Sequence, residues 1–173
     1  NVTTTSPSNY GVLTTISAHV ASAGGTPTGY VTFLDGTNVI AQLPLNVSGD
    51  AAFSTDELSV GAHTINAVYN SDTWFAMSSN SASHTITAAT STALTSTGSP
   101  TTYGASVTFT ATVTPTVLGA GTPVGTVNFM DGATLIGSVA VDGLGEAGLA
   151  ITTLGVGAHT ITADFVGSSG WGL

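Results

Sequence analysis

The chain repeats its own sequence once, and this repeat constrains the fold more than any other feature. Residues 25–69 align without gaps with residues 121–165, and 19 of the 45 aligned positions are identical. The period, 121 − 25 = 96 residues, is too long for a solenoid repeat and suits a self-contained β-sandwich of about 100 residues. The sequence therefore predicts two copies of one domain, over residues 1–88 and 89–173.

Apolar and polar residues alternate along the predicted strands. Val107, Phe109, Ala111 and Val113 alternate with threonines, and this period of two indicates a strand with one buried face. No segment has the apolar spacing of an amphipathic helix, so the fold is predicted to be all-β. The most regular strand of each copy has these residues facing inward: His63, Ile65, Ala67 and Tyr69 in the first, and His159, Ile161, Ala163 and Phe165 in the second.

An aspartate–glycine pair ends one predicted strand in each copy. Asp35-Gly36 and Asp131-Gly132 both follow a Val-x-Phe strand. Such pairs readily adopt the positive φ values of a type I′ turn. A tight hairpin of that type is expected at both positions.

The two copies differ at their C-terminal ends. The first closes with a predicted strand over residues 83–87, and the second has no counterpart. The preferred interpretation is a segment cut from a longer array, and the alternative is an open sheet edge that a neighbouring subunit completes with a donated strand. Residues 87–90 contain neither glycine nor proline, which predicts a stiff connection between the copies.

Composition excludes several classes of function. The chain has nine acidic residues and neither lysine nor arginine, so its formal net charge is −9. Nucleic acid and anionic membrane surfaces are not expected partners, because both attract proteins through basic side chains. Without lysine and cysteine there is no Schiff-base, thiolate or zinc-thiolate chemistry. No apolar run approaches the roughly 20 residues that span a bilayer, and Asn1 follows no export signal, as expected of a mature or excised segment.

Three motifs carry a resemblance to a known family. The elements G-T-P-x-G-x-V-x-F, D-G and V-G-A-H-T-I-x-A occur in this order in both copies. As an ordered set they resemble the bacterial Ig-like domain repeat family, which forms arrays on large secreted and surface proteins. The family commonly continues with a Gly-Asp turn, from which residues 70–72 and 166–168 depart.

The resemblance implies two tandem immunoglobulin-like β-sandwiches, the second lacking its final strand within this segment. It implies an extracellular or cell-surface location, with neighbouring Ig-like modules or identical subunits as partners. It brings no catalytic residue and no cofactor with it.

Few residues remain as candidates for chemistry. His63 and His159 repeat on the inward face, where a histidine at the rim of a core is expected to be a structural hydrogen-bonder rather than a catalyst. Asp50, Asp56 and Glu57 lie close in sequence and offer Ca²⁺ a set of carboxylates. They lack the spacing of an EF-hand, so isolated solvated acids are the preferred interpretation.

Aromatic and sulfur-containing side chains gather on a predicted loop. Trp74, Phe75 and Met77 lie in residues 70–81, and Trp171 occupies a similar place in the second copy. Loops seldom expose such residues without a reason. Packing between modules, or against a neighbour in an array, is the first interpretation. The alternative is a platform for glycan or for a cell-surface protein, since flat rings stack on sugars.

Two asparagines match the acceptor pattern for N-glycosylation. Asn1 begins the triplet Asn-Val-Thr and Asn46 begins Asn-Val-Ser. In a bacterial protein such matches arise mostly by chance, and extra mass on either residue is the test.

Together these features predict a non-enzymatic structural module: a stalk, spacer or filament subunit that extends, displays or polymerises by strand-edge complementation. The first alternative is an adhesin module that binds glycan or protein through the loop from Trp74 to Met77. The second is a module appended to a secreted enzyme.

Overall fold

A computed structural model describes residues 1–172 of the chain. In this range every regular element is a β-strand, which confirms the predicted all-β fold class. The chain divides into two compact units, and the first spans Asn1–Ile86. Unit 2 begins at Thr87, two residues before the predicted start of the second domain.

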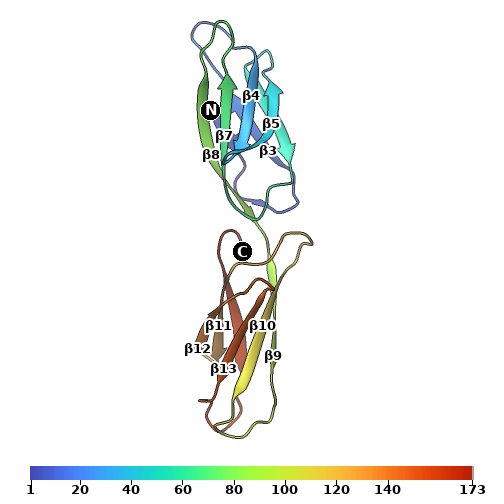
Figure 1. Cartoon of the computed structure of the whole chain (residues 1–173), viewed down its shortest axis with the longest axis vertical. Helices are drawn as coiled ribbons and strands as arrows, with labels where there is room; N and C mark the ends of the chain where they lie inside the picture. The colour runs from blue at the N-terminus through green and yellow to red at the C-terminus, as the bar shows by residue number, and fades with distance from the viewer. Residues whose placement is uncertain (173) are drawn as a thin grey trace. The chain divides into compact units, whose positions relative to one another are not determined.

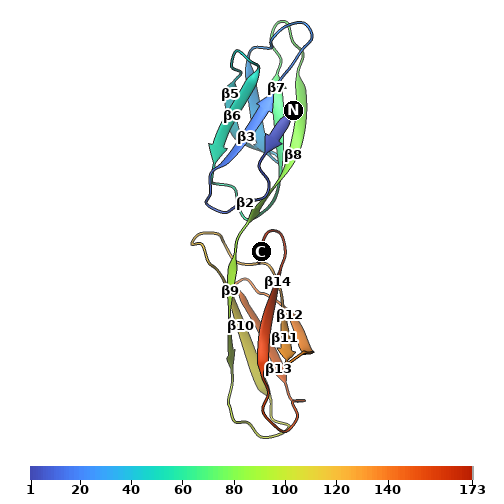
Figure 2. The ribbon, with the colours of Figure 1, turned by 180° about the vertical axis from the view of Figure 1, so that it is seen from behind.

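Unit 1 is a sandwich of two β-sheets. One sheet has the order β1 (Val2–Thr4), β3 (Thr14–His19) and β6 (Asp50–Thr55). The other has the order β2 (Ser8–Asn9), β8 (Ser78–Thr87), β7 (Gly61–Asn70), β4 (Tyr30–Asp35) and β5 (Asn38–Pro44). Figures 1 and 2 show these sheets from opposite sides.

The core of unit 1 follows from the alternation of its strands. Ile16 on β3, Val31 and Phe33 on β4, and Ile65 on β7 are fully buried between the sheets. The predicted inward face of β7 is confirmed, because its buried residues are those at every second position.

Unit 2 repeats this sandwich with fewer strands. One sheet has the order β13 (Glu146–Ile151), β10 (Val107–Pro115) and β9 (Thr90–Ser96), and the other has the order β12 (Thr134–Ala140), β11 (Gly125–Asp131) and β14 (Ile161–Gly167). Up to residue 172, no strand corresponds to β2 or β8. The strand β14 is therefore an edge strand, whereas its counterpart β7 is paired on both sides.

The predicted hairpins are present, but the predicted turn type is wrong. A register shift between Phe33 and Leu34 lets Asp35 pair with Asn38, so the loop consists of residues 36 and 37. Gly36 has a φ of 58°, and residue 37 is not among the residues with positive φ. Positive φ at the first loop position alone fits a type II′ turn, because type I′ requires it at both. Unit 2 has the same shift and the same glycine conformation.

Candidate functional site

His63 uses both ring nitrogens in hydrogen bonds that tie the hairpin to β7. Its Nδ1 lies 2.8 Å from Asp35 Oδ2, and its Nε2 lies 2.8 Å from the carbonyl oxygen of Ser59. A carboxylate and a carbonyl only accept hydrogen bonds, so both contacts are satisfied when the ring donates from both nitrogens. His63 is only 8% exposed. This geometry is that of a structural hydrogen-bonder, because neither nitrogen is left for a substrate.

His159 repeats the arrangement in unit 2. Its Nδ1 lies 2.6 Å from Asp131 Oδ2, and its Nε2 lies 3.2 Å from the Gly155 carbonyl oxygen. The hydrogen bond with Asp131, followed by that with Gly155, raises the pKa of His159. The side chain is 25% exposed, against 8% for His63. The same bond is thus more open to solvent in unit 2.

Sequence reasoning missed a third histidine in the rim of unit 1. His84 on β8 is 1% exposed, and its Nε2 lies 2.9 Å from Ser8 Oγ, which is 2.6 Å from Thr14 Oγ1. Across the described chain nothing lies within hydrogen-bond distance of His84 Nδ1. Burial, and then the charge of His63 opposite it on β7, lower the pKa of His84. The available signal was its alternation with Ile86 on the predicted closing strand.

The Ser8–His84 contact has the length of a nucleophile–base pair but not the rest of its geometry. A general base of this kind is oriented by a third group on its other nitrogen. Nδ1 of His84 has no such partner in residues 1–172. His63 does have an orienting carboxylate, but its Nε2 is held by a backbone carbonyl instead of a hydroxyl. His84 therefore has a hydroxyl partner but no orienting group, and His63 has an orienting carboxylate but no hydroxyl partner. Neither histidine completes a catalytic triad.

The loop that carries Trp74 is fixed by one carboxylate. Asp72 Oδ1 accepts hydrogen bonds from the backbone N–H groups of Trp74 and Phe75, both at 2.7 Å, and its Oδ2 accepts one from the Thr28 hydroxyl at 2.7 Å. The bond from Thr28, followed by that from Trp74, lowers the pKa of Asp72 to about 2. Trp74 is 85% exposed and Met77 68%, whereas Phe75 packs against the core of unit 1. The loop thus displays Trp74 from an anchored backbone.

Trp171 does not occupy the place of Trp74. With the repeat period of 96 residues it aligns with Phe75, and Gly170 aligns with Trp74. Trp171 is 6% exposed, and its backbone forms a parallel bridge with Ala88. Trp171 is thus a buried residue, and its role in packing between modules stays a prediction.

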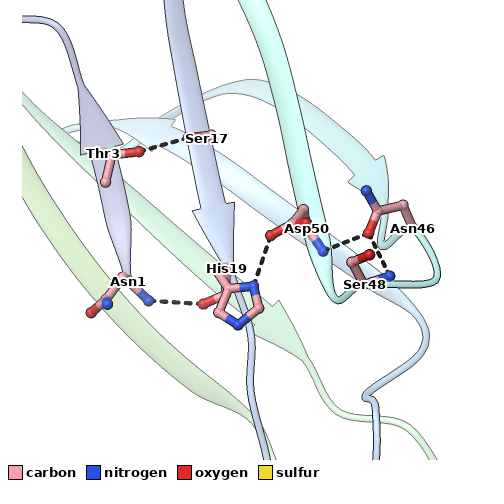
Figure 3. Close-up of polar contacts among 7 residues, drawn as sticks. All are labelled: Asn1, Thr3, Ser17, His19, Asn46, Ser48 and Asp50. Atoms are coloured by element: carbon pink, nitrogen blue, oxygen red, sulfur yellow. Dashed lines mark hydrogen bonds and ion pairs between the residues drawn. The ribbon is translucent and has the colours of Figure 1, made fainter.

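Both candidate glycosylation residues lie beside one polar chain on unit 1 (Figure 3). Asn46 Oδ1 accepts hydrogen bonds from the N–H groups of Ser48 and Asp50, both at 2.9 Å. The Asp50 carboxylate contacts His19 Nδ1 at 2.7 Å, and the amino group of Asn1 donates to the His19 carbonyl oxygen at 2.8 Å. Asn46 therefore fixes a turn, and glycosylation of either asparagine stays a prediction.

The acids considered for Ca²⁺ are spread along β6 and the loop after it. Asp50 begins β6 and is engaged with His19, whereas Asp56 and Glu57 follow the end of the strand at Thr55. Six residues of strand separate the first two acids by roughly 20 Å. In the part of the chain that the structure describes, no group of three acidic, histidine or cysteine side chains is placed to hold a metal ion.

The fold and the repeated histidine–aspartate bond define a tandem β-sandwich protein of immunoglobulin-like class. The family model of the bacterial Ig-like domain (group 3) matches the chain twice, over residues 2–89 and 94–172. The chain belongs to this family, which confirms the resemblance seen in its motifs.

Two solved structures are similar to most of the chain. The fibronectin(III)-like modules of Clostridium thermocellum CbhA share 19% identity at a TM-score of 0.41, covering 99% of this chain and 88% of theirs. The D0-D1 domain of intimin shares 17% identity at a TM-score of 0.37, covering 94% of this chain and 89% of its own. No curated protein matches the chain. Residues 1–172 contain no helix long and apolar enough to cross a membrane.

Proposed function

We propose that the chain is a non-enzymatic structural module of an extracellular or cell-surface bacterial protein, acting as a stalk, spacer or filament subunit. The observation that carries this proposal is that each of the two repeated histidines uses both ring nitrogens in hydrogen bonds within its own unit. His63 and His159 each hold a hairpin aspartate on one nitrogen and a backbone carbonyl on the other. The same side chains that invite a catalytic interpretation stabilise the sandwich, once in each unit.

Membership of the bacterial Ig-like family supports the same role. Charge supports it as well, since a formal charge of −9 without basic residues favours solubility over non-specific association with nucleic acid or membranes. Partners of the module, on this proposal, are neighbouring Ig-like modules or identical subunits.

A domain replacement tests the structural role. In the protein that carries this segment, residues 1–172 are replaced by two unrelated Ig-like sandwiches of the same length. A spacer tolerates this exchange, so surface labelling with an antibody against a distal epitope and the activity of the whole protein are expected to stay unchanged. Loss of activity while surface labelling persists would contradict the proposal, because the segment would then supply a specific contact.

A second function, glycan or protein binding, is favoured by the anchored loop. Trp74 is 85% exposed on a backbone that Asp72 holds through three hydrogen bonds, and such pre-organisation reduces the entropy cost of binding. Saturable binding to a glycan array that is lost in Trp74→Ala and kept in Tyr103→Ala would establish this alternative. Tyr103 is the matched control, because it is 73% exposed and lies in unit 2.

A further inference from the structure

Two histidines lie opposite each other on neighbouring strands of unit 1. His63 on β7 is paired directly with His84 on β8, and the two residues are 8% and 1% exposed. Opposite residues on one face of an antiparallel pair have Cβ atoms about 5 Å apart, and like charges placed there destabilise the pair. A positive charge on both rings would therefore weaken the pairing of β7 with β8.

The surroundings of His84 suit a neutral ring. Its Nε2 lies 2.9 Å from Ser8 Oγ, and a hydroxyl can donate or accept, so this contact is satisfied in either neutral tautomer. Its Nδ1 has no hydrogen-bond partner in residues 1–172. A charged ring carries an N–H group on both nitrogens, and the one on Nδ1 would be buried without an acceptor. Protonation of His84 is therefore costly while β8 stays in place.

The titratable groups near His84 do not balance a charge on its ring. Asp35 at the end of β4 is already bound through Oδ2 to His63 Nδ1, at 2.8 Å. From β2 and β3 the ring is reached by hydroxyls, that of Ser8 directly and that of Thr14 through Ser8. The remaining titratable side chains on the adjoining segments are Tyr10, which packs against the core, and the exposed Asp56 and Glu57. Burial, followed by the charge of His63, accordingly lowers the pKa of His84.

Three segments of unit 1 depend on β8 for their pairing. Among the strands, residues 61–64 pair with β8 alone, because β4 reaches no further along β7 than Ile65. The short strand β2 has β8 as its neighbour in the sheet (Figure 2). The pairs of β4 with β5 and with β7, and the sheet of β1, β3 and β6, do not involve β8. Loss of β8 would therefore unpair β2 and residues 61–64 while most of the sandwich keeps its partners.

We propose that His84 is an acid-sensitive switch for β8: protonation of its ring releases β8 and β2 and unpairs residues 61–64, while the other strands of unit 1 stay folded. A histidine is suited to this task, because its charge changes between neutral and mildly acidic pH. Release would expose the edge of β7 to pairing with another strand only in acid. The proposal goes beyond the structural role, which holds whether or not acid opens unit 1.

Amide hydrogen exchange of the chain at pH values of about 7.5 and about 5, corrected for intrinsic exchange rates, tests the proposal. For a histidine with a pKa of about 6.5 in the open state, linkage limits the gain in opening over this interval to about thirtyfold. We expect the protection factors of residues 61–64 and of β8 to fall by about tenfold or more. Residues 31–33 of β4 pair with β5 and β7 and are expected to keep theirs. An equal fall there would overturn the proposal, because acid would then unfold the whole unit.

A matched pair of variants assigns the response to one histidine. His84→Gln keeps a side chain that can hydrogen-bond to Ser8 and removes the titrating ring, so the fall in protection between the two pH values is expected to disappear. His19→Gln is the control, because the His19 side chain is 52% exposed on β3 and its partner is Asp50. This control is expected to respond like the natural chain. A fall that persists in His84→Gln would overturn the assignment to His84.

A finer pH series on the natural chain keeps the test decisive when His84→Gln does not fold. The protection of residues 61–64 is expected to begin to fall below a pH of about 6.5, where a solvated histidine gains its proton. NMR signals of the His84 ring, recorded in the same series, report its protonation. Protection that is lost only near pH 4, where carboxylates titrate, would overturn the proposal. So would a His84 ring that becomes protonated while residues 61–64 stay protected.

Discussion

At the scale of single residues, one aligned side chain in each unit fixes the same turn. Asn46 Oδ1 accepts hydrogen bonds from the N–H groups of Ser48 and Asp50, and Asp142 Oδ1 accepts them from Leu144 and Glu146, all at 2.9 Å. The bonds from Glu146 and Leu144 lower the pKa of Asp142. Asn46 and Asp142 both present a side-chain oxygen as acceptor, and only Asn46 also has an amide nitrogen. The turn therefore requires the oxygen and not the nitrogen.

Substitutions of Asn46 distinguish the contribution of its side-chain oxygen from that of its amide nitrogen. Asn46→Ala removes both hydrogen bonds and is expected to destabilise unit 1 by about 1 kcal/mol. Asn46→Asp keeps the acceptor and should leave the free energy of unfolding nearly unchanged. Chemical denaturation of the three chains measures the difference, and an equal loss in both variants would contradict this assignment.

The histidines of the two units respond to pH in opposite directions. Burial lowers the pKa of His84, so the unfolded chain binds more protons there, and unit 1 loses stability as pH falls below about 6.5. The bond with Asp131 raises the pKa of His159, so its contribution to unit 2 is complete below about 6.5 and is lost as pH rises through the folded pKa.

A variant of His159 tests the second of these signs. His159→Gln is expected to lower the melting temperature of unit 2 more at pH 5.5 than at pH 8.5, because only the lower pH populates the charged ring that Asp131 stabilises. Thermal unfolding followed by NMR signals assigned to unit 2 provides the measurement. An equal effect at both pH values would show that the charge of His159 does not contribute.

Local patterns predicted the elements but not all of their contacts. Alternation was sufficient to place the inward faces of β7 and β10, because each strand has one buried side. The turn type was missed because a register shift after Phe33 moves Asp35 out of the loop. His84 was missed because its partner Ser8 lies 76 residues away in sequence. The repeated segment Val-Gly-Ala-His-Thr-Ile shows the limit most clearly: residues 61–64 pair with β8, whereas residues 157–160, of identical sequence, lie outside the described strands.

The turn between β5 and β6 depends on a glycine. Gly49 has a φ of +81°, and a Cβ there would lie 2.5 Å from the Val20 carbonyl oxygen. Gly145 in unit 2 has a φ of +86° and the same conflict, at 2.6 Å from the Val113 oxygen. In both units this turn therefore lies close to a backbone carbonyl at the end of the neighbouring strand, that of Val20 or of Val113.

Alanine substitutions at two glycines distinguish crowding from backbone conformation. Gly49→Ala combines both penalties and is expected to cost about 3 kcal/mol or more. Gly36→Ala is the control, because Gly36 has a φ of +58° and a Cβ added there would meet nothing within 4 Å, so only about 1 kcal/mol is expected. Equal losses in denaturation experiments would mean that the carbonyl of Val20 moves away freely.

At the scale of the whole chain, residues 1–172 form two sandwiches of one family that differ in their described strands. Unit 1 pairs β7 on both sides, whereas in unit 2, up to residue 172, β14 is paired only with β11. Tyr103 and Val156 are 73% and 89% exposed, whereas their counterparts in unit 1, Tyr10 and Val60, are half-buried. In the isolated 173-residue chain, unit 2 is therefore expected to be the less stable unit, because it buries less apolar surface.

The central claim is that the hexapeptide Val-Gly-Ala-His-Thr-Ile, at residues 60–65 and 156–161, depends on a partner strand for its backbone pairing: residues 61–64 pair with β8, and residues 157–160 pair with no described strand. Amide hydrogen exchange of the isolated chain, without any added strand, tests it most directly. We predict strong protection at residues 61–64 and exchange close to that of an unstructured peptide at residues 157–160. Equal protection of the two segments would contradict the claim, because the hexapeptide would then form a strand without a partner.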